Sequence, residues 1–195
     1  MNVEEIVNNV VELTQRPDKR LTIITHLNAI MNLLSSKADF YDDLVETTIA
    51  IDPTLYAQSI SISSILTRFK KFKYLNRTGS KQYITPIGAD KLLTPRGQVQ
   101  PNKYYLAGTT LNFTLDQLSP TLEIGYYQYR QPLNALLDTN WMTEKIPYIL
   151  IDLVTSRTLQ GIGDVQGAGT YWQTGVTMFD AAVGDFAFGY VPGTL

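Results

Sequence analysis

Apolar side chains recur at helical spacing through the first 36 residues. One stripe ends before Pro17 and a second begins after Asp18. This pattern predicts helices at about residues 1–13 and 18–36, with Asp18 as the N-cap of the second. Because the loop between them is short, we expect an antiparallel hairpin. The stripes are formed by Val3, Ile6, Val7, Val10 and Val11, and by Ile23, Ile24, Leu27, Ile30, Met31 and Leu34.

The pattern changes in the middle of the chain. Residues 59–63 alternate between serine and isoleucine, which is typical of a half-buried strand. Glycine and proline separate further apolar runs, as turns do between strands. We expect one antiparallel sheet between about residues 44 and 132, with a short helix at 89–93. Its strands are expected at 45–51, 59–63, 104–106, 110–115 and 122–129.

Helical spacing returns near Trp141. One helix should carry Pro147 in its first turn and end at Gly161 and Gly163, and another is expected at 171–183, weakened by Gly175. The order of helices, strands and helices predicts an α+β fold. We expect a small antiparallel helical bundle from residues 1–43 and 133–184, an inserted antiparallel β-lobe at 44–132, and an extended tail at 185–195.

Composition narrows the possible functions. The 195 residues carry a formal net charge of −2, which gives no electrostatic case for a nucleic-acid groove. The chain has no cysteine, so thiolate metal sites and cysteine nucleophiles are excluded. The N-terminus lacks the basic and apolar regions of a signal peptide. No apolar run reaches the roughly 18 residues of a membrane span.

Candidate catalytic groups are few and isolated. His26 is the only histidine and lies among apolar helix positions, so we expect a packed side chain. Asp42 and Asp43 form a carboxylate pair, which we expect in a turn. Asp152 is expected to face solvent or to pair with Arg157.

The glycine-rich segments at 161–163 and 167–169 do not form a phosphate-binding loop. They follow a predicted helix instead of a strand, and no lysine follows them. We interpret them as a helix cap and a flexible link. The sequence therefore predicts no catalytic, cofactor-binding or metal-binding residue, and we expect that the protein is not an enzyme.

A basic and aromatic segment at residues 68–77 has two interpretations. The favoured one is an amphipathic strand with its aromatic side chains inward and its cations outward. The other is a positive rim that faces DNA, with stacking and phosphate contacts. The cations concerned are Arg68, Lys70, Lys71 and Lys73.

Several motifs, taken in order, resemble one family. The chain resembles the head-to-tail adaptor, or connector, proteins of short-tailed bacteriophages, and the resemblance spans about residues 14–164. The motifs are LTQRPD at 13–18, SKADFYDDLVE at 36–46, ILTRFKKFKYL at 65–75 and IGYYQY at 124–129, followed by Pro132, Trp141, Pro147 and the helix end from Arg157 to Ile162-Gly163-Asp164.

The resemblance implies a structural virion protein. Such adaptors form a ring, usually of twelve subunits, that binds beneath the portal, extends the DNA channel and offers a docking surface for the tail tube or nozzle. It also implies a helical bundle with a β-lobe, and a location at the head–tail interface of the virion after assembly in the host cytoplasm. We expect no membrane contact.

The aromatic and basic segments suggest where the partners of such an adaptor would bind. The aromatic tail is expected to dock on the portal or on an adjacent subunit through Phe186, Phe188 and Tyr190. The basic rim of Arg68, Lys70, Lys71 and Lys73 is expected to face DNA or the tail. Two alternatives stay open at this point: a virion-associated peptidoglycan hydrolase that uses two carboxylates, and a nucleic-acid-binding module that uses residues 68–77.

Overall fold

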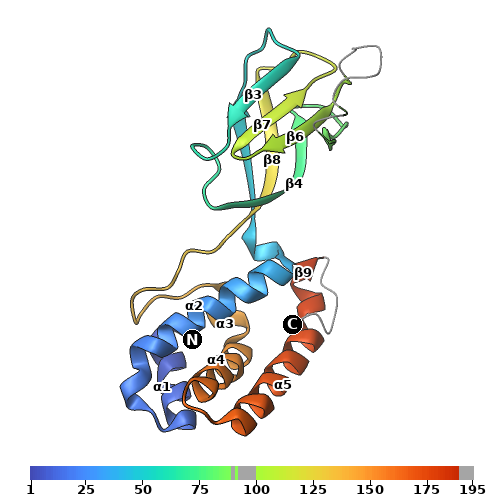
Figure 1. Ribbon diagram of the computed structural model, residues 1–195. Coiled ribbons are helices and arrows are strands. Elements are labelled where there is room, and N and C mark those ends of the chain that lie inside the picture. The colour runs from blue at the N-terminus through green and yellow to red at the C-terminus, as the bar shows by residue number, and fades with distance from the viewer. Residues whose placement is uncertain (89–90, 92–99, 189–195) are drawn as a thin grey trace. The chain divides into compact units, whose positions relative to one another are not determined.

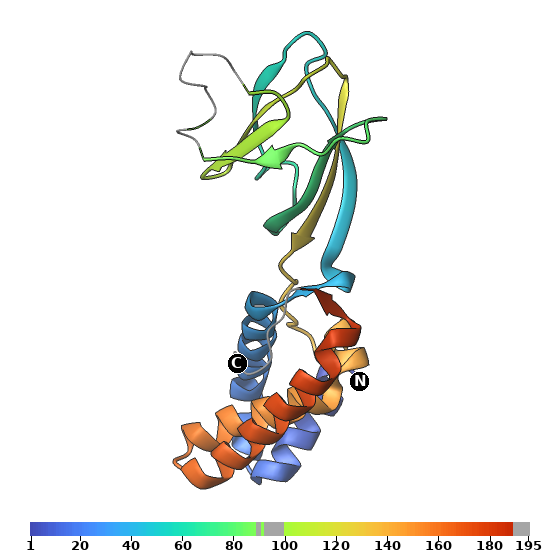
Figure 2. The ribbon, with the colours of Figure 1, turned by 90° about the vertical axis from the view of Figure 1, so that its right-hand side faces the viewer.

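The computed structural model describes residues 1–88, 91 and 100–188, and its fold is α+β, as the sequence predicts (Figures 1 and 2). The chain divides into two compact units. The first, called here the helical unit, comprises Met1–Asp42 and Arg130–Leu195, and the second, the β unit, comprises Asp43–Tyr129. The chain therefore leaves the helical unit once, builds the β unit and returns.

The two helices that the N-terminal apolar stripes predict are confirmed. They are α1 (Val3–Thr14) and α2 (Arg20–Lys37). Asn2 caps α1, because its side chain accepts a hydrogen bond from the Glu5 amide while the Glu5 carboxylate accepts one from the Asn2 amide.

The prediction that Asp18 caps α2 is wrong. Asp18 lies in a 3-10 turn, Pro17–Lys19, and Lys19 occupies the N-cap position without a side-chain cap bond. The Asp18 carboxylate binds the Arg16 guanidinium instead, through hydrogen bonds of 2.8 and 2.7 Å. The Asp18 carboxylate thus binds a nearby cation and does not cap the N-terminus of α2.

The C-terminal helices pack around α4. They are α3 (Trp141–Lys145), α4 (Pro147–Gly161) and α5 (Val165–Ala182), and α4 contacts α1, α2 and α5. Pro147 begins α4, and α4 ends at Gly161, both as predicted. Gly175 allows α5 to approach α4 closely, because a Cβ atom at Gly175 would lie 2.8 Å from the Leu153 side chain.

The predicted flexible link at 167–169 is wrong, since α5 begins at Val165 and includes these residues. Asp164 caps the helix by accepting a hydrogen bond of 2.9 Å from the Gly167 amide. Packing of α5 against α4 offsets the poor helix propensity of the glycines.

The end of the helical unit also differs from an extended tail starting at residue 185. Val183–Asp185 form a 3-10 turn, and β9 (Ala187–Phe188) then pairs antiparallel with β1 (Asp39–Phe40). The segment after α5 is therefore joined by hydrogen bonds to the segment after α2.

The β unit contains two sheets instead of the single predicted sheet. The first has the order β2–β8–β4, with β2 (Leu44–Ala50), β8 (Thr121–Gln128) and β4 (Phe69–Arg77). The second has the order β3–β7–β6–β5, with β3 (Ala57–Ser61), β7 (Thr110–Thr114), β6 (Lys103–Ala107) and β5 (Thr85–Pro86).

Pairing in the β unit is not antiparallel throughout, because β5 pairs parallel with β6. The other pairs within the two sheets are antiparallel. The short helix predicted at 89–93 lies outside the described residues except for Lys91. Strands at 45–51, 59–63, 104–106, 110–115 and 122–129 are confirmed, and their ends differ from the prediction by at most two residues.

Each unit has its own apolar core. The core of the helical unit includes Leu27, Leu150 and Phe179, whereas side chains from both sheets, such as Leu75 and Phe113, share the core of the β unit. No residue belongs to both sets. Of the helices that the structure describes, none combines the length and the apolar character needed to cross a membrane.

Candidate partner-binding surfaces

The basic segment forms β4, and two irregularities set its side-chain directions. The register against β8 shifts between Phe69 and Lys71 and again between Phe72 and Tyr74. Each bulge adds one residue, so Phe69 and Phe72, three apart, can both reach the core of the β unit. The predicted inward direction of these two aromatic rings is thus confirmed.

The cations of β4 differ in exposure. Lys71 and Lys73 are exposed, and Lys70 is partly buried. Arg68 has a positive φ of 48°, and its carbonyl accepts a hydrogen bond of 2.7 Å from the Tyr129 amide. Arg68 thus lies just before β4, whereas Lys70, Lys71 and Lys73 lie within its first five residues.

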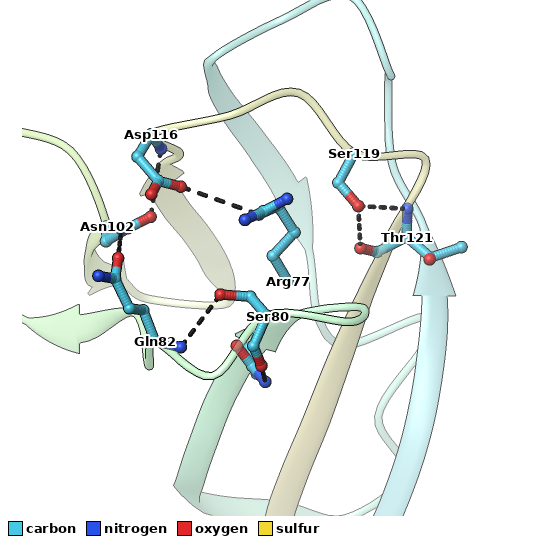
Figure 3. A network of polar contacts seen from close by, with 8 residues as sticks. Arg77, Ser80, Gln82, Asn102, Asp116, Ser119 and Thr121 are labelled. Atoms are coloured by element: carbon cyan, nitrogen blue, oxygen red, sulfur yellow. Dashed lines mark hydrogen bonds and ion pairs between the residues drawn. The ribbon is translucent and has the colours of Figure 1, made fainter.

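Arg77, at the other end of β4, belongs to a polar network (Figure 3). Its guanidinium lies 3.8 Å from the Asp116 carboxylate. The Asp116 amide donates to Asn102, and the Asn102 amide group donates in turn to Gln82. This network joins the end of β4 and the segment after β7 to the loops that contain Gln82 and Asn102. Arg77 therefore has a structural role here.

Tyr74 does not follow the predicted inward direction of the aromatic side chains. Its ring lies across Gly125 of β8, where a Cβ atom would clash with it. Its hydroxyl donates a hydrogen bond of 2.9 Å to Glu46. Burial, followed by this hydrogen bond, raises the pKa of Tyr74 to about 12. The second bulge of β4 turns the ring away from the core.

The three residues predicted to contact the portal differ in what surrounds them. Phe186 is partly buried, and its ring packs 6.0 Å from the Phe40 ring and 5.9 Å from the Trp141 ring. Its own chain therefore covers part of this side chain. Phe188 pairs through its backbone with Asp39 in β1. Tyr190 lies outside the described residues.

A cation completes this aromatic cluster, which sequence reasoning did not find. The Arg130 guanidinium lies 4.1 Å from the centroid of the Trp141 ring and 5.4 Å from that of Phe40. Such contacts stabilise by about 0.5–2 kcal/mol. No sequence pattern links Arg130 to Phe40, which lies far from it along the chain, or to Trp141 in the following helix, so the contacts form only once the chain has folded.

The carboxylate pair at 42–43 has structural partners. Lys145 donates hydrogen bonds of 2.7 and 2.8 Å to the Asp42 carboxylate. Asp43 is buried. The ion pair thus gives Asp42 a structural role, and the two neighbouring carboxyl groups lie in different environments.

Two comparisons with known proteins were made by sequence. No protein-family model matches the chain, and no curated protein matches it. Within residues 1–88, 91 and 100–188, no group of three or more histidine, cysteine or acidic residues could hold a metal ion.

His26 is packed between helices, as expected. Its Nδ1 lies 3.3 Å from the Thr158 hydroxyl of α4. Burial, with a smaller contribution from the positive charge of Arg157, lowers the pKa of His26 below its ordinary value. This arrangement favours a neutral side chain with a packing role.

Asp152 is partly buried beside Gly175 of α5 and forms no ion pair with Arg157 in the part of the chain that the structure describes. Five residues along a helix place two side chains about 140° apart, so the expected pair is geometrically unfavourable. Burial raises the pKa of the Asp152 carboxyl above 3.8.

This shift predicts a stability change. A raised carboxyl pKa means that ionisation costs more in the folded protein than in the unfolded chain, so stability falls as pH rises through the folded pKa. Asp152→Asn should therefore raise the free energy of unfolding at pH 7, and the gain should vanish once the pH falls below about 3.8. Urea titrations at pH 3 and pH 7 measure both values.

Asp138→Asn is the matched control. Hydrogen bonds from the Ala135 and Asn134 amides lower the pKa of Asp138, so its loss should instead reduce stability at pH 7. Equal shifts for the two variants would contradict the assignment.

A groove between α4 and α5 was not predicted from the sequence. It has a volume of about 530 Å³. It is lined by Ser156, Arg157, Gln160, Val165, Ala168, Gly169 and Trp172. The small residues at 168 and 169, which the sequence pattern suggested were part of a link, make room for it once they lie in a helix.

Proposed function

We propose that this chain is a structural subunit of the head-to-tail adaptor of a short-tailed bacteriophage. In this proposal it forms a ring, usually of twelve copies, between the portal and the tail and extends the DNA channel. The helical unit is then the small antiparallel bundle of such an adaptor, and the β unit is its inserted lobe.

One observation carries the proposal: a β unit is inserted between two helical segments that share one core. This is the architecture that the ordered sequence motifs imply. Leu21, Leu137 and Val165 of the helical unit are each more than 70% exposed, which is apolar area that contacts between copies could cover.

The proposal assigns partners to the predicted surfaces. Lys71 and Lys73, together with Arg68 and Lys70, face the passing DNA or the tail. Phe188 and Tyr190 bind the portal or an adjacent subunit. Phe186 contributes less of its ring to such contacts, because Phe40 and Trp141 cover part of it.

The test is the state of assembly. We expect the purified chain, alone or mixed with a portal ring from a short-tailed phage, to form particles with about twelve times the monomer mass and a central channel. Mass photometry and electron microscopy measure both properties. A chain that stays monomeric at high concentration and leaves portal rings unchanged would contradict the proposal.

A further inference from the structure

Two leucine side chains are presented to solvent by a loop that is unusually well fixed. The loop, called here the leucine loop, comprises residues 133–138 of the helical unit. Leu137 is 75% exposed and Leu136 is 41% exposed. An exposed apolar tip is ordinary in a mobile loop, whereas this one is held at several points.

The hydrogen bonds of the leucine loop anchor both of its ends. Leu133 is buried, and its backbone exchanges two hydrogen bonds of 2.9 Å with the Asn28 side chain of α2. The Asp138 carboxylate accepts hydrogen bonds of 2.9 and 2.8 Å from the Asn134 and Ala135 amides. The loop therefore presents its leucines with little further ordering cost on binding.

The first turn of α1 holds the tip of the loop and adds negative charge beside it. The Glu4 amide donates a hydrogen bond of 2.8 Å to the Leu136 carbonyl. The Val3 amide donates one of 3.1 Å to the Asp138 carbonyl. Because Glu4 and Glu5 lie in this turn, the exposed leucines have acidic neighbours.

The α4–α5 groove has the complementary chemistry. Val165 and Trp172 give it apolar walls, and Arg157 is the single charged residue among those that line it. The groove also has free space, because a Cβ atom added at Gly169 would meet nothing within 4 Å. It can therefore accept an apolar side chain with an acidic neighbour.

The groove and the leucine loop lie on different sides of the helical unit. In Figure 1 the loop, in gold, runs along the upper left of this unit, whereas the first turns of α5, in orange, which line the groove, lie at its lower end. Figure 2, which faces the right-hand side, shows α5 in front. Every copy thus carries both surfaces, and one copy cannot bring its own loop into its own groove.

We propose that the leucine loop of one copy inserts into the α4–α5 groove of the next. Leu137 fills the space beside Gly169, and the carboxylates of the first turn of α1 face Arg157. A contact between unlike surfaces is heterologous and forms a ring when its rotation closes. The inference rests on the proposed ring and identifies the surfaces that build it.

The chain contains no cysteine, which makes cross-linking selective. We expect Leu137→Cys mixed with Gly169→Cys to give a cross-linked dimer with a short bis-maleimide, whereas each variant alone gives little. A chain that carries both substitutions should give a ladder of cross-linked oligomers. Tyr148→Cys, at another exposed position of the helical unit, is the control partner for Gly169→Cys and should not cross-link.

The cysteine-free Leu137→Ser variant provides a second measurement. It should raise the concentration needed for assembly at least about tenfold, because it removes a buried leucine from each contact. Circular dichroism should be unchanged, since Leu137 is exposed in the monomer.

The outcomes separate the two proposals. Rings that form while the Leu137–Gly169 pair cross-links no better than the control would overturn the contact and leave the adaptor role standing. If neither rings nor portal complexes form, both proposals are overturned. Cross-linked dimers from the mixture, together with the ladder from the double variant, support the contact.

Discussion

Phe179→Ala is expected to destabilise the helical unit by about 3–5 kcal/mol, which is the usual cost of removing a buried phenylalanine side chain. Phe179 is fully buried in α5, and its ring lies 6.3 Å from Phe40 and 6.5 Å from Phe186. The substitution leaves a cavity where α5 and the segments after α2 and α5 meet.

Tryptophan fluorescence measures this loss selectively. Trp141 and Trp172 are the chain's two tryptophans, and both belong to the helical unit. Phe113→Ala is the control, because Phe113 is equally buried but lies in the core of the β unit. We expect it to leave the tryptophan transition in urea unchanged. An equal shift with both variants would show that the two cores unfold together.

Gly175→Val is expected to destabilise the contact between α4 and α5 by about 1–3 kcal/mol or more, the usual cost of overpacking. A Cβ atom at this position would lie 2.8 Å from two carbon atoms of Leu153. Valine adds two methyl groups beyond that clash. Because the atoms nearest this position belong to α4, α5 has to move away from α4.

Gly169→Ala in the same helix is the matched control. Its Cβ atom would meet nothing within 4 Å, so the gain in helix propensity, about 0.5–1 kcal/mol, should raise stability. Urea denaturation followed by tryptophan fluorescence compares the two variants. If both variants were destabilised by a similar amount, α5 would tolerate no side chain at either position. That result would contradict the explanation by close packing at Gly175.

Local periodicity predicted the elements of the fold better than their boundaries. The apolar stripes of α1 and α2 and the alternation in β3 follow from local spacing, which sequence contains. The start of α5 was missed because two glycines conceal a helix that tertiary packing stabilises. The division into two sheets depends on strand partners far apart in sequence, which periodicity does not encode.

The candidate surfaces were harder to predict for the same reason. The cations at 68–73 could be grouped from the sequence because they lie close together along the chain. The stacking of Arg130 on Trp141 and the packing of Phe186 against Phe40 join residues from three separate segments. The α4–α5 groove could be predicted only if Gly169 were known to lie in a helix and to face open space. Composition alone suggested that this segment is a linker.

The insertion of the β unit has a consequence for how such a chain can change during evolution. The strands that enter and leave it are hydrogen-bonded neighbours, with Leu44 opposite Tyr127. Partners across such a pair lie about 5 Å apart, so the two exits from the helical unit can be bridged by a short turn. The lobe can therefore be exchanged for another one, or lost, in a single recombination event without rethreading the helices.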